Sequence, residues 1–252
     1  MLSLLKKLLG SSDEPKVEPV AEVDAAVDGA RAVAIAEACI VEAAALSRSL
    51  SHSAIAPMFK NEITERDGAN LLGRAVSGFE ASDPRSALAT ALGLSMSGLR
   101  ATAFFSAPEL AAASDQLALA AGRHLPVVFH LACQANDGTV GQLGSGHDVY
   151  HNTADSGCFS LFASNVQEAV DFSLVARRAA EQALIPAIVA MDGAQTAASI
   201  QNVRLPSLEL VKRYLGGSED TIDAPTGAQE LIFGSTRRRV PRWYDLEEPM
   251  LY

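Results

Sequence analysis

Cysteine is scarce in this chain of 252 residues. Its three cysteines, Cys39, Cys133 and Cys158, are far apart in the sequence, and no two of them form a Cys-x-x-Cys pair. A structural zinc site and a four-cysteine iron–sulfur cluster both need groups of thiolates, so neither can be built from this chain alone. We therefore predict no metal site here, and any iron–sulfur cluster must belong to a partner.

Basic residues are also few. The chain has 20 lysines and arginines against 30 aspartates and glutamates, which gives a formal net charge of −10. Binding to a phosphate backbone needs a basic surface, so we predict that nucleic acid is not a partner. The local exception is an arginine run formed by Arg237, Arg238, Arg239 and Arg242. Such a run either binds an acidic partner or a phosphate, or simply forms part of the solvated surface. The second case is the commoner one.

Long apolar runs are absent as well. No stretch approaches the ~18 residues that a membrane span needs, and lysines interrupt the apolar start of the chain where a secretory signal would have none. We therefore expect a cytoplasmic protein. Residues 1–10 nevertheless place leucines on one helical face and Lys6 and Lys7 on the other. This pattern predicts a short amphipathic helix that orders only against a partner groove or a membrane surface, and otherwise frays.

Residues 11–24 are rich in Pro, Glu, Ser and Val without periodicity, which is typical of a linker. We assign 1–27 to the helix and linker, and we place the start of the folded body near Asp28. From there, short apolar runs alternate with helical segments. The predicted helices are 30–46, 84–97 with Asp83 as its cap, 107–121 with a capping box at Ser106 and Glu109, a helix capped by Ser164 and Gln167, and 206–214.

The predicted strands lie between these helices, at 101–105, 126–132, 158–163 and 186–191. Strands alternating with helices favour an α/β fold in which a parallel sheet is covered by helices on both faces. Ligands of such sheets bind at the carboxyl ends of the strands. The loops after these four strands are therefore where we expect a functional site.

Five segments of the chain, in order, resemble the first domain of pyruvate:ferredoxin oxidoreductases, which belong to the 2-oxoacid oxidoreductase family. They are Val27-Asp28-Gly29, PVVFHLA at 126–132, GHDV at 146–149, SNVQEAVD at 164–171 and DGAQTAASIQ at 192–201. The resemblance implies the pyrimidine-binding fold of thiamine-diphosphate enzymes for 28–215. It also implies that 216–252 is a C-terminal extension, because RRRVPRWYDLEEP looks like the family's interdomain connector.

In that family this domain holds the aminopyrimidine of thiamine diphosphate, and a second domain holds the diphosphate through magnesium. The diphosphate motif, a Gly-Asp-Gly followed by paired asparagines, is absent from this sequence. The resemblance therefore implies a partner chain or domain that carries the diphosphate and iron–sulfur sites, and an oligomeric assembly. Thiamine diphosphate is expected only as a cofactor shared with that partner.

Thiamine chemistry needs a carboxylate at the pyrimidine ring nitrogen, because it favours the imino tautomer that removes the C2 proton. The family's Glu-Met-x-Ser-Glu stretch falls here on Glu80-Ala81-Ser82-Asp83-Pro84, so Pro84 occupies the position of its second glutamate. Glu80 and Asp83 are the candidate catalytic carboxylates, and Glu80 is the candidate for binding the cofactor. Asp83 is also placed to cap the helix that begins at Pro84, which is the interpretation we favour.

The family's substrate-binding positions are changed too. Its threonine-containing turn falls on 47–51 with Leu50 at the threonine position, and its carboxylate-binding arginine is Gln134. An amide cannot reproduce the bidentate grip of arginine on a carboxylate. His147 and Asp148 survive from the family's Gly-Asp-His-x-Asp-Val loop, either as a ligand-orienting or acid–base pair or as a loop-fixing hydrogen bond. Gln134, His147 and Asp148 are the candidate substrate-binding residues.

A second family arginine is replaced by Gln195, so the losses fall in separate segments while the helix caps and core strands are kept. Two functions stay open. The chain is a component of a 2-oxoacid:ferredoxin oxidoreductase that acts only within a larger assembly, or it is a catalytically inactive relative that serves assembly or regulation. Whether the chain is itself an active oxidoreductase, and whether it is a segment of a longer enzyme, the sequence leaves open.

Overall fold

The structure is a computed structural model that describes residues 23–47, 55–133 and 147–245. Its strands are β1 (Val23–Asp28), β2 (Ala43–Ser47), β3 (Ser77–Ala81), β4 (Ala101–Ser106), β5 (Val128–Cys133), β6 (Phe159–Ala163), β7 (Ala187–Asp192), β8 (Ile200–Leu205), β9 (Thr221–Asp223) and β10 (Thr236–Arg238). Its helices are α2 (Gly29–Ile40), α3 (Ile55–Glu65), α4 (Pro84–Met96), α5 (Ala107–Gly122), α6 (Asp148–His151), α7 (Val166–Ala183), α8 (Leu208–Tyr214) and α9 (Gly227–Phe233), with 3-10 turns at Ala154–Ser156 and Trp243–Asp245. The predicted helix at 1–10 and the positions Leu50 and Gln134 lie outside the described residues, so they stay predictions.

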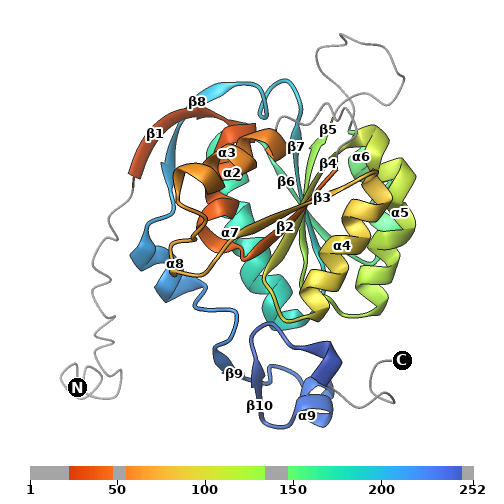
Figure 1. The fold of residues 1–252 in the computed structure, drawn as a ribbon. Helices are drawn as coiled ribbons and strands as arrows, with labels where there is room; N and C mark the ends of the chain where they lie inside the picture. Colours follow the sequence, from red (N-terminus) through yellow and green to blue (C-terminus); the bar gives the residue numbers. More distant parts are fainter. Residues whose placement is uncertain (1–22, 48–54, 134–146, 246–252) are drawn as a thin grey trace, which may run out of the picture.

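Six strands form one parallel sheet in the order β3-β2-β4-β5-β7-β6. Figure 1 shows α2, α3 and α7 on one face of this sheet and α4 and α5 on the other, which confirms the predicted α/β fold. Each face has its own apolar layer. Phe59 of α3 and Leu174 of α7 belong to one layer with Phe104, whereas Leu88 of α4 belongs to the other with Phe129. The central strands are buried on both faces, so their sequences are apolar almost throughout.

Two helix starts follow the predicted capping pattern. Asp83 caps α4, its Oδ1 atom accepting the Ser86 N–H at 2.9 Å, and Pro84 occupies the first helical turn. At α5 the Glu109 carboxylate accepts the Ser106 N–H at 2.7 Å, as a capping box requires. The predicted cap of α7 was wrong by one residue. Its cap is Asn165, whose side chain accepts the Glu168 N–H, because an amide oxygen serves this role as well as a hydroxyl.

The first helix is shorter than predicted. The expected helix at 30–46 ends at Ile40, and its last part is the strand β2, which lies between β3 and β4. Alanine has the highest helix propensity, so the run Ala43-Ala44-Ala45 favours helix in isolation. Pairing with two neighbouring strands outweighs that propensity here. The chain before α2 is also a strand, since β1 pairs antiparallel with β8 and sets Asp28 opposite Ile200.

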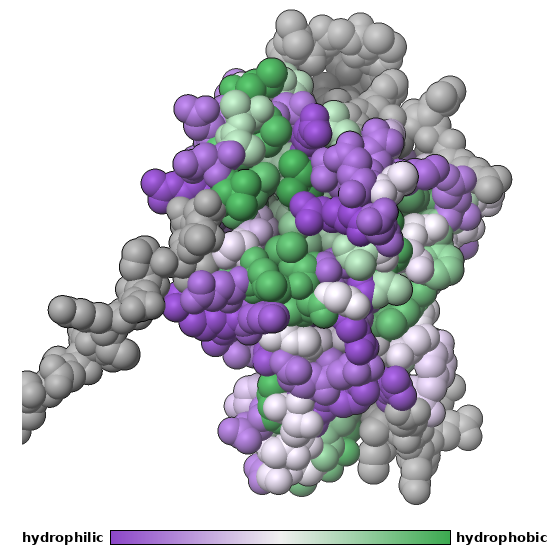
Figure 2. Space-filling model, turned by 60° about the vertical axis from the view of Figure 1, so that its left-hand side comes forward, coloured by the Kyte–Doolittle hydropathy of each residue, from purple (hydrophilic) through white to green (hydrophobic). Residues whose placement is uncertain are grey.

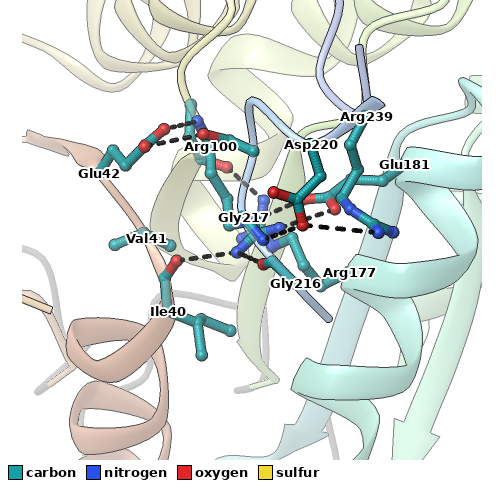
Figure 3. A network of polar contacts seen from close by, with 12 residues as sticks. Ile40, Val41, Glu42, Arg100, Arg177, Glu181, Gly216, Gly217, Asp220 and Arg239 are labelled. Carbon is teal, nitrogen blue, oxygen red and sulfur yellow. Dashed lines mark hydrogen bonds and ion pairs between the residues drawn. The ribbon is translucent and has the colours of Figure 1, made fainter. Parts of the chain in front are cut away.

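A buried ionic network joins several elements at the amino end of the sheet (Figure 3). Arg100, just before β4, reaches the Glu181 carboxylate at the end of α7 with two contacts of 2.6 and 2.9 Å. Its third nitrogen donates to the Gly216 carbonyl at 3.1 Å, and its backbone N–H donates to Glu42 at 2.9 Å. The side chains of Arg100 and Glu181 are 1% and 0% exposed. Burial alone would lower the pKa of Arg100, but Glu181 raises it, so the guanidinium stays charged.

The arginine run takes part in this same region. Arg237 is buried, and its guanidinium donates to the Glu181 carbonyl and to the Gln229 side chain, each at 2.7 Å. Burial lowers the pKa of Arg237 to about 10. Arg239 lies 3.9 Å from the Asp220 carboxylate (Figure 3). The interpretation of the run as a solvated surface was therefore wrong for Arg237, because the end of α7 offers backbone carbonyls that need donors.

Ten large apolar side chains of the described residues are exposed, and Leu231 is the most exposed of them at 88%. Figure 2 shows polar side chains separating several apolar patches on the face turned forward. Ile200 and Val23, near opposite ends of the β1–β8 ribbon, are 72% and 56% exposed. Across the described part of the chain, no helix is both long and apolar enough to cross a membrane.

We predict that Glu181→Gln lowers the free energy of unfolding by about 3–5 kcal/mol, because it leaves the Arg100 charge buried without its counter-charge. Urea unfolding followed by circular dichroism measures the loss. Glu65→Gln, at an exposed position of α3, is the matched control and should stay within about 0.5 kcal/mol of the wild type. Equal stability of the two variants would show that the buried pair does not hold this region.

Candidate active site

The turn that follows β7 is fixed by hydrogen bonds at the carboxyl end of the sheet. Asp192 ends β7 and pairs in register with Cys133, which ends β5. The Gly193 N–H donates to the Cys133 carbonyl at 2.7 Å. Asp192 Oδ1 accepts the N–H groups of Ala194 and Gln195 at 2.8 and 2.6 Å. Two neighbouring strand ends are thus locked together at the edge where parallel sheets bind their ligands.

His147 lies against this turn. Its Nε2 atom is 3.1 Å from Asp192 Oδ2, and its ring meets the ring of Phe162 on β6 at an edge, with the centroids 4.8 Å apart. The His147 side chain is 50% exposed, whereas that of Asp192 is 11% exposed. Burial alone would raise the pKa of Asp192, but the backbone N–H groups of Gln195 and Ala194 and the His147 ring lower it. Asp192 is therefore an ionised group that orients the imidazole.

The structure corrects the partner of His147. The sequence suggested Asp148, but Asp148 is the exposed first residue of α6, and the hydrogen-bond partner of His147 is Asp192, 45 positions along the chain. At the start of a helix, residues that are adjacent in sequence point in different directions. The ends of strands in one sheet, in contrast, bring residues from distant parts of the chain together. The hypothesis of a ligand-orienting or acid–base pair therefore passes to His147 and Asp192. The sequence signal for Asp192 was its place at the end of a predicted strand.

Asp83 is used to start a helix. Its carboxylate accepts the N–H and the hydroxyl of Ser86 at 2.9 and 2.7 Å, and the hydroxyl of Ser82 at 2.8 Å. The Ser86 hydrogen bonds are the main reason that the pKa of Asp83 falls to about 2. A carboxylate held ionised by three donors is a poor partner for a ring nitrogen that must share a proton.

Glu80 is on the edge strand β3 and is also engaged. Its carboxylate forms an ion pair with Lys60 of α3, and its side chain is 35% exposed. In the sheet order, β3 lies four strands away from β7, or about 19 Å at the usual strand spacing. The structure therefore does not bring Glu80 and Asp83 together with His147. Gln134, the remaining candidate, lies outside the described residues.

A buried cluster inside the fold was missed by sequence reasoning. Glu37 of α2 lies 2.9 Å from His130 of β5 and 2.9 Å from Arg177 of α7, and none of these side chains is more than 1% exposed. Burial alone would raise the pKa of Glu37, but Arg177 and His130 lower it. The one signal in the sequence was His130, the only polar residue in an apolar strand. Because it lies under the helices, this cluster holds layers together and does not reach the carboxyl edge.

The chain matches a family of known proteins. The family model described as pyruvate flavodoxin/ferredoxin oxidoreductase, thiamine diphosphate-binding, matches residues 52–241. That range contains five of the six strands of the sheet, all but β2, and both residues of the His147–Asp192 contact. The chain belongs to this family. It therefore contains the thiamine diphosphate-binding domain of this family, as the sequence resemblance implied.

Similar proteins include the pyruvate synthase subunits PorA of Pyrococcus abyssi and Thermotoga maritima. They are 30% and 32% identical over 136 and 133 residues, which cover 53% and 52% of this chain and 34% of each subunit. A probable pyruvate-flavodoxin oxidoreductase of Escherichia coli is 31% identical over 117 residues, covering 46% of this chain and 10% of that enzyme. The matched segments thus span about a third or less of these relatives.

A solved structure shares the fold. It is a 2-oxoglutarate:ferredoxin oxidoreductase from Magnetococcus marinus with 2-oxoglutarate, coenzyme A and succinyl-CoA bound. The match has a TM-score of 0.59 and 22% identity, and it covers 82% of this chain and 36% of that one. At this identity the comparison supports the arrangement of the sheet and helices.

Both described candidates for the carboxylate at the thiamine pyrimidine are engaged with other residues. Glu80 is paired with Lys60, and Asp83 accepts three hydrogen bonds from Ser82 and Ser86. Within the described ranges, no three His, Cys, Asp or Glu residues are grouped so that they could hold a metal ion. No step of a reaction is therefore assigned to these carboxylates.

The capping role of Asp83 predicts a change in acid stability. A carboxylate whose pKa is lowered by folding stabilises the fold above its unfolded pKa, and this contribution is lost as the pH falls through the folded pKa of about 2. We predict that the thermal midpoint of the wild type falls more steeply between about pH 4 and about pH 2 than that of Asp83→Asn, whose side chain does not titrate. Asp223→Asn, at an exposed position of β9, should keep the wild-type slope. Parallel curves for wild type and Asp83→Asn would contradict the capping account.

Proposed function

We propose that this chain is the pyrimidine-side component of a 2-oxoacid:ferredoxin oxidoreductase assembly, and that a partner chain or domain supplies the diphosphate and iron–sulfur sites. The observation that carries this proposal is the family match over 52–241, on a fold whose carboxyl edge keeps the ordered turn at Asp192. The sequence has no Cys-x-x-Cys pair and no diphosphate motif, so electron transfer and diphosphate binding need a partner. We place this assembly in the cytoplasm, in keeping with the expectation from the sequence.

A second candidate is a non-catalytic relative that serves assembly or regulation. The state of Asp83 favours it, because the carboxylate nearest to the family's glutamate position is bound by serine donors and followed by Pro84. In that case the chain keeps its core and partner surfaces, while thiamine diphosphate either does not bind or binds without turnover.

Reconstitution separates the two. The chain is co-expressed with a candidate subunit of this family that carries the diphosphate motif, and the purified complex is titrated with thiamine diphosphate and magnesium by calorimetry. Reduction of a viologen dye is then followed with pyruvate and with 2-oxoglutarate. The component hypothesis predicts a stable complex, stoichiometric binding of the cofactor to the complex and not to the chain alone, and 2-oxoacid-dependent dye reduction.

Glu80→Gln tests the remaining carboxylate in the same complex, with Glu65→Gln as the matched control. If Glu80 serves the cofactor, its replacement should reduce turnover at least about 100-fold, which is the scale of a positioned acid–base group, while Glu65→Gln has no effect. A stable complex without cofactor binding or dye reduction would favour the non-catalytic relative. Failure to form any complex would contradict both candidates.

A further inference from the structure

A cavity of about 360 Å³ lies at the amino end of the sheet, away from the carboxyl edge that carries His147 and Asp192. Its walls include Arg74, which precedes β3, Lys212 of α8 and the turn at 216–220, which precedes β9. This volume is within the usual range for a site that binds a small molecule. Nothing in the proposed function uses this end of the sheet.

Three guanidinium groups converge on one carboxylate oxygen at the rim of this cavity. Glu219 Oε1 lies 2.6 Å from Arg74 Nη2. The same oxygen lies 3.5 Å from Arg238 Nη2 and 4.0 Å from Arg242 Nη2. Only the first of these distances is that of a strong hydrogen bond. Nε of Arg238 is also buried without a hydrogen-bond partner among the described residues, so one carboxylate leaves donors of this cluster unused.

The charge around the cavity is positive, although the whole chain carries −10. Lys212 is exposed and makes no hydrogen bond or ion pair with another described residue. The basic side chains that line or border the cavity are Arg74, Lys212, Arg238, Arg239 and Arg242, and the carboxylates are Glu42, Glu219 and Asp220. Basic groups therefore outnumber acidic ones here, which favours an anionic ligand.

Asp220 is committed to the wall of the cavity. Its Oδ2 atom accepts the Gly217 N–H at 2.7 Å and lies 3.9 Å from Arg239 (Figure 3). Gly216 has a φ of +68°, and a Cβ atom at this position would clash with the Asp220 carboxylate. The tight glycine turn thus holds Asp220 against the backbone. Glu219, whose side chain is 44% exposed, is left as the carboxylate that a ligand can displace.

The same turn rests on the buried ionic network. The Gly216 carbonyl accepts a hydrogen bond from Arg100 at 3.1 Å, and the Ser218 hydroxyl donates to Glu42 at 2.8 Å. Arg74 reaches that Glu42 carboxylate too, at 3.1 Å. A site whose wall is fixed by buried contacts is preorganised for its ligand.

We propose that this cavity binds an anion that carries a phosphate group, with Arg74 and Lys212 as binding residues and Arg238 and Arg242 at the rim. A phosphate monoester offers three oxygens that accept hydrogen bonds in different directions, whereas Glu219 offers one oxygen to three guanidinium groups. Arginine donates to phosphate in a bidentate manner, and lysine binds it as a point charge. The phosphate replaces Glu219 as the shared acceptor.

The test is nuclear magnetic resonance of the full chain labelled with nitrogen-15, titrated with inorganic phosphate at about pH 7.5, where phosphate carries nearly two negative charges. Sodium chloride at matched ionic strength is the control for screening. We expect saturable shifts of the Gly216 and Gly217 amide signals with phosphate, and only small shifts without saturation with chloride.

Two variants should move the apparent affinity in opposite directions. Lys212→Gln removes one charge-assisted contact and should weaken phosphate binding about tenfold. Glu219→Gln removes the carboxylate that competes for the arginines and should tighten binding about threefold. Arg213→Gln is the matched control, because Arg213 is the next residue of α8 and is also exposed, but does not line this cavity. It should stay within about twofold of the wild type.

The proposal is overturned if no shift saturates, if Lys212→Gln binds phosphate as tightly as the wild type, or if Glu219→Gln binds it more weakly. Equal losses in Lys212→Gln and Arg213→Gln would also overturn it, because they would show attraction by the general positive charge. If Glu219→Gln does not fold, the comparison of Lys212→Gln with Arg213→Gln decides alone. Neither of these side chains contacts another described residue through a hydrogen bond or ion pair.

Discussion

The bidentate contact between Arg100 and Glu181 is the interaction on which the rest of the fold depends. It joins the start of β4 to the end of α7, and the same arginine binds Gly216 in the C-terminal segment. Arg237 also caps the C-terminal end of α7, because its guanidinium donates a hydrogen bond to the Glu181 carbonyl. Burying two charges is costly unless geometry and further hydrogen bonds compensate for the lost water, and here both do. The ionic network thus fixes which helix end meets which strand.

The two ends of the sheet have different tasks. At the amino end the Arg100 and Glu181 side chains are buried and paired with each other, so they hold elements together and are closed to solvent. At the carboxyl end the polar groups near β5 and β7 are ordered but partly exposed, with His147 held by Asp192.

Features that depend on interactions between nearby residues were predicted correctly from the sequence. The strand at β4, the capping box at Ser106 and the cap at Asp83 all depend on residues within a few positions of one another, and all were predicted. It failed where distant segments decide. The strand β2 was taken for helix because alanine favours helix in isolation, and its neighbours in the sheet come from later in the chain. The partner of His147 is 45 positions away, and no local pattern links it to Asp192.

The central claim is that the buried Arg100–Glu181 contact holds the amino end of the sheet together. Hydrogen–deuterium exchange of the wild type and Glu181→Gln tests it most directly. The account predicts slow exchange around Arg100 and residue 181 in the wild type and faster exchange there in the variant, while peptides spanning 147–151 and 192–197 exchange equally in both proteins. Equal exchange around Arg100 in the two proteins would contradict it.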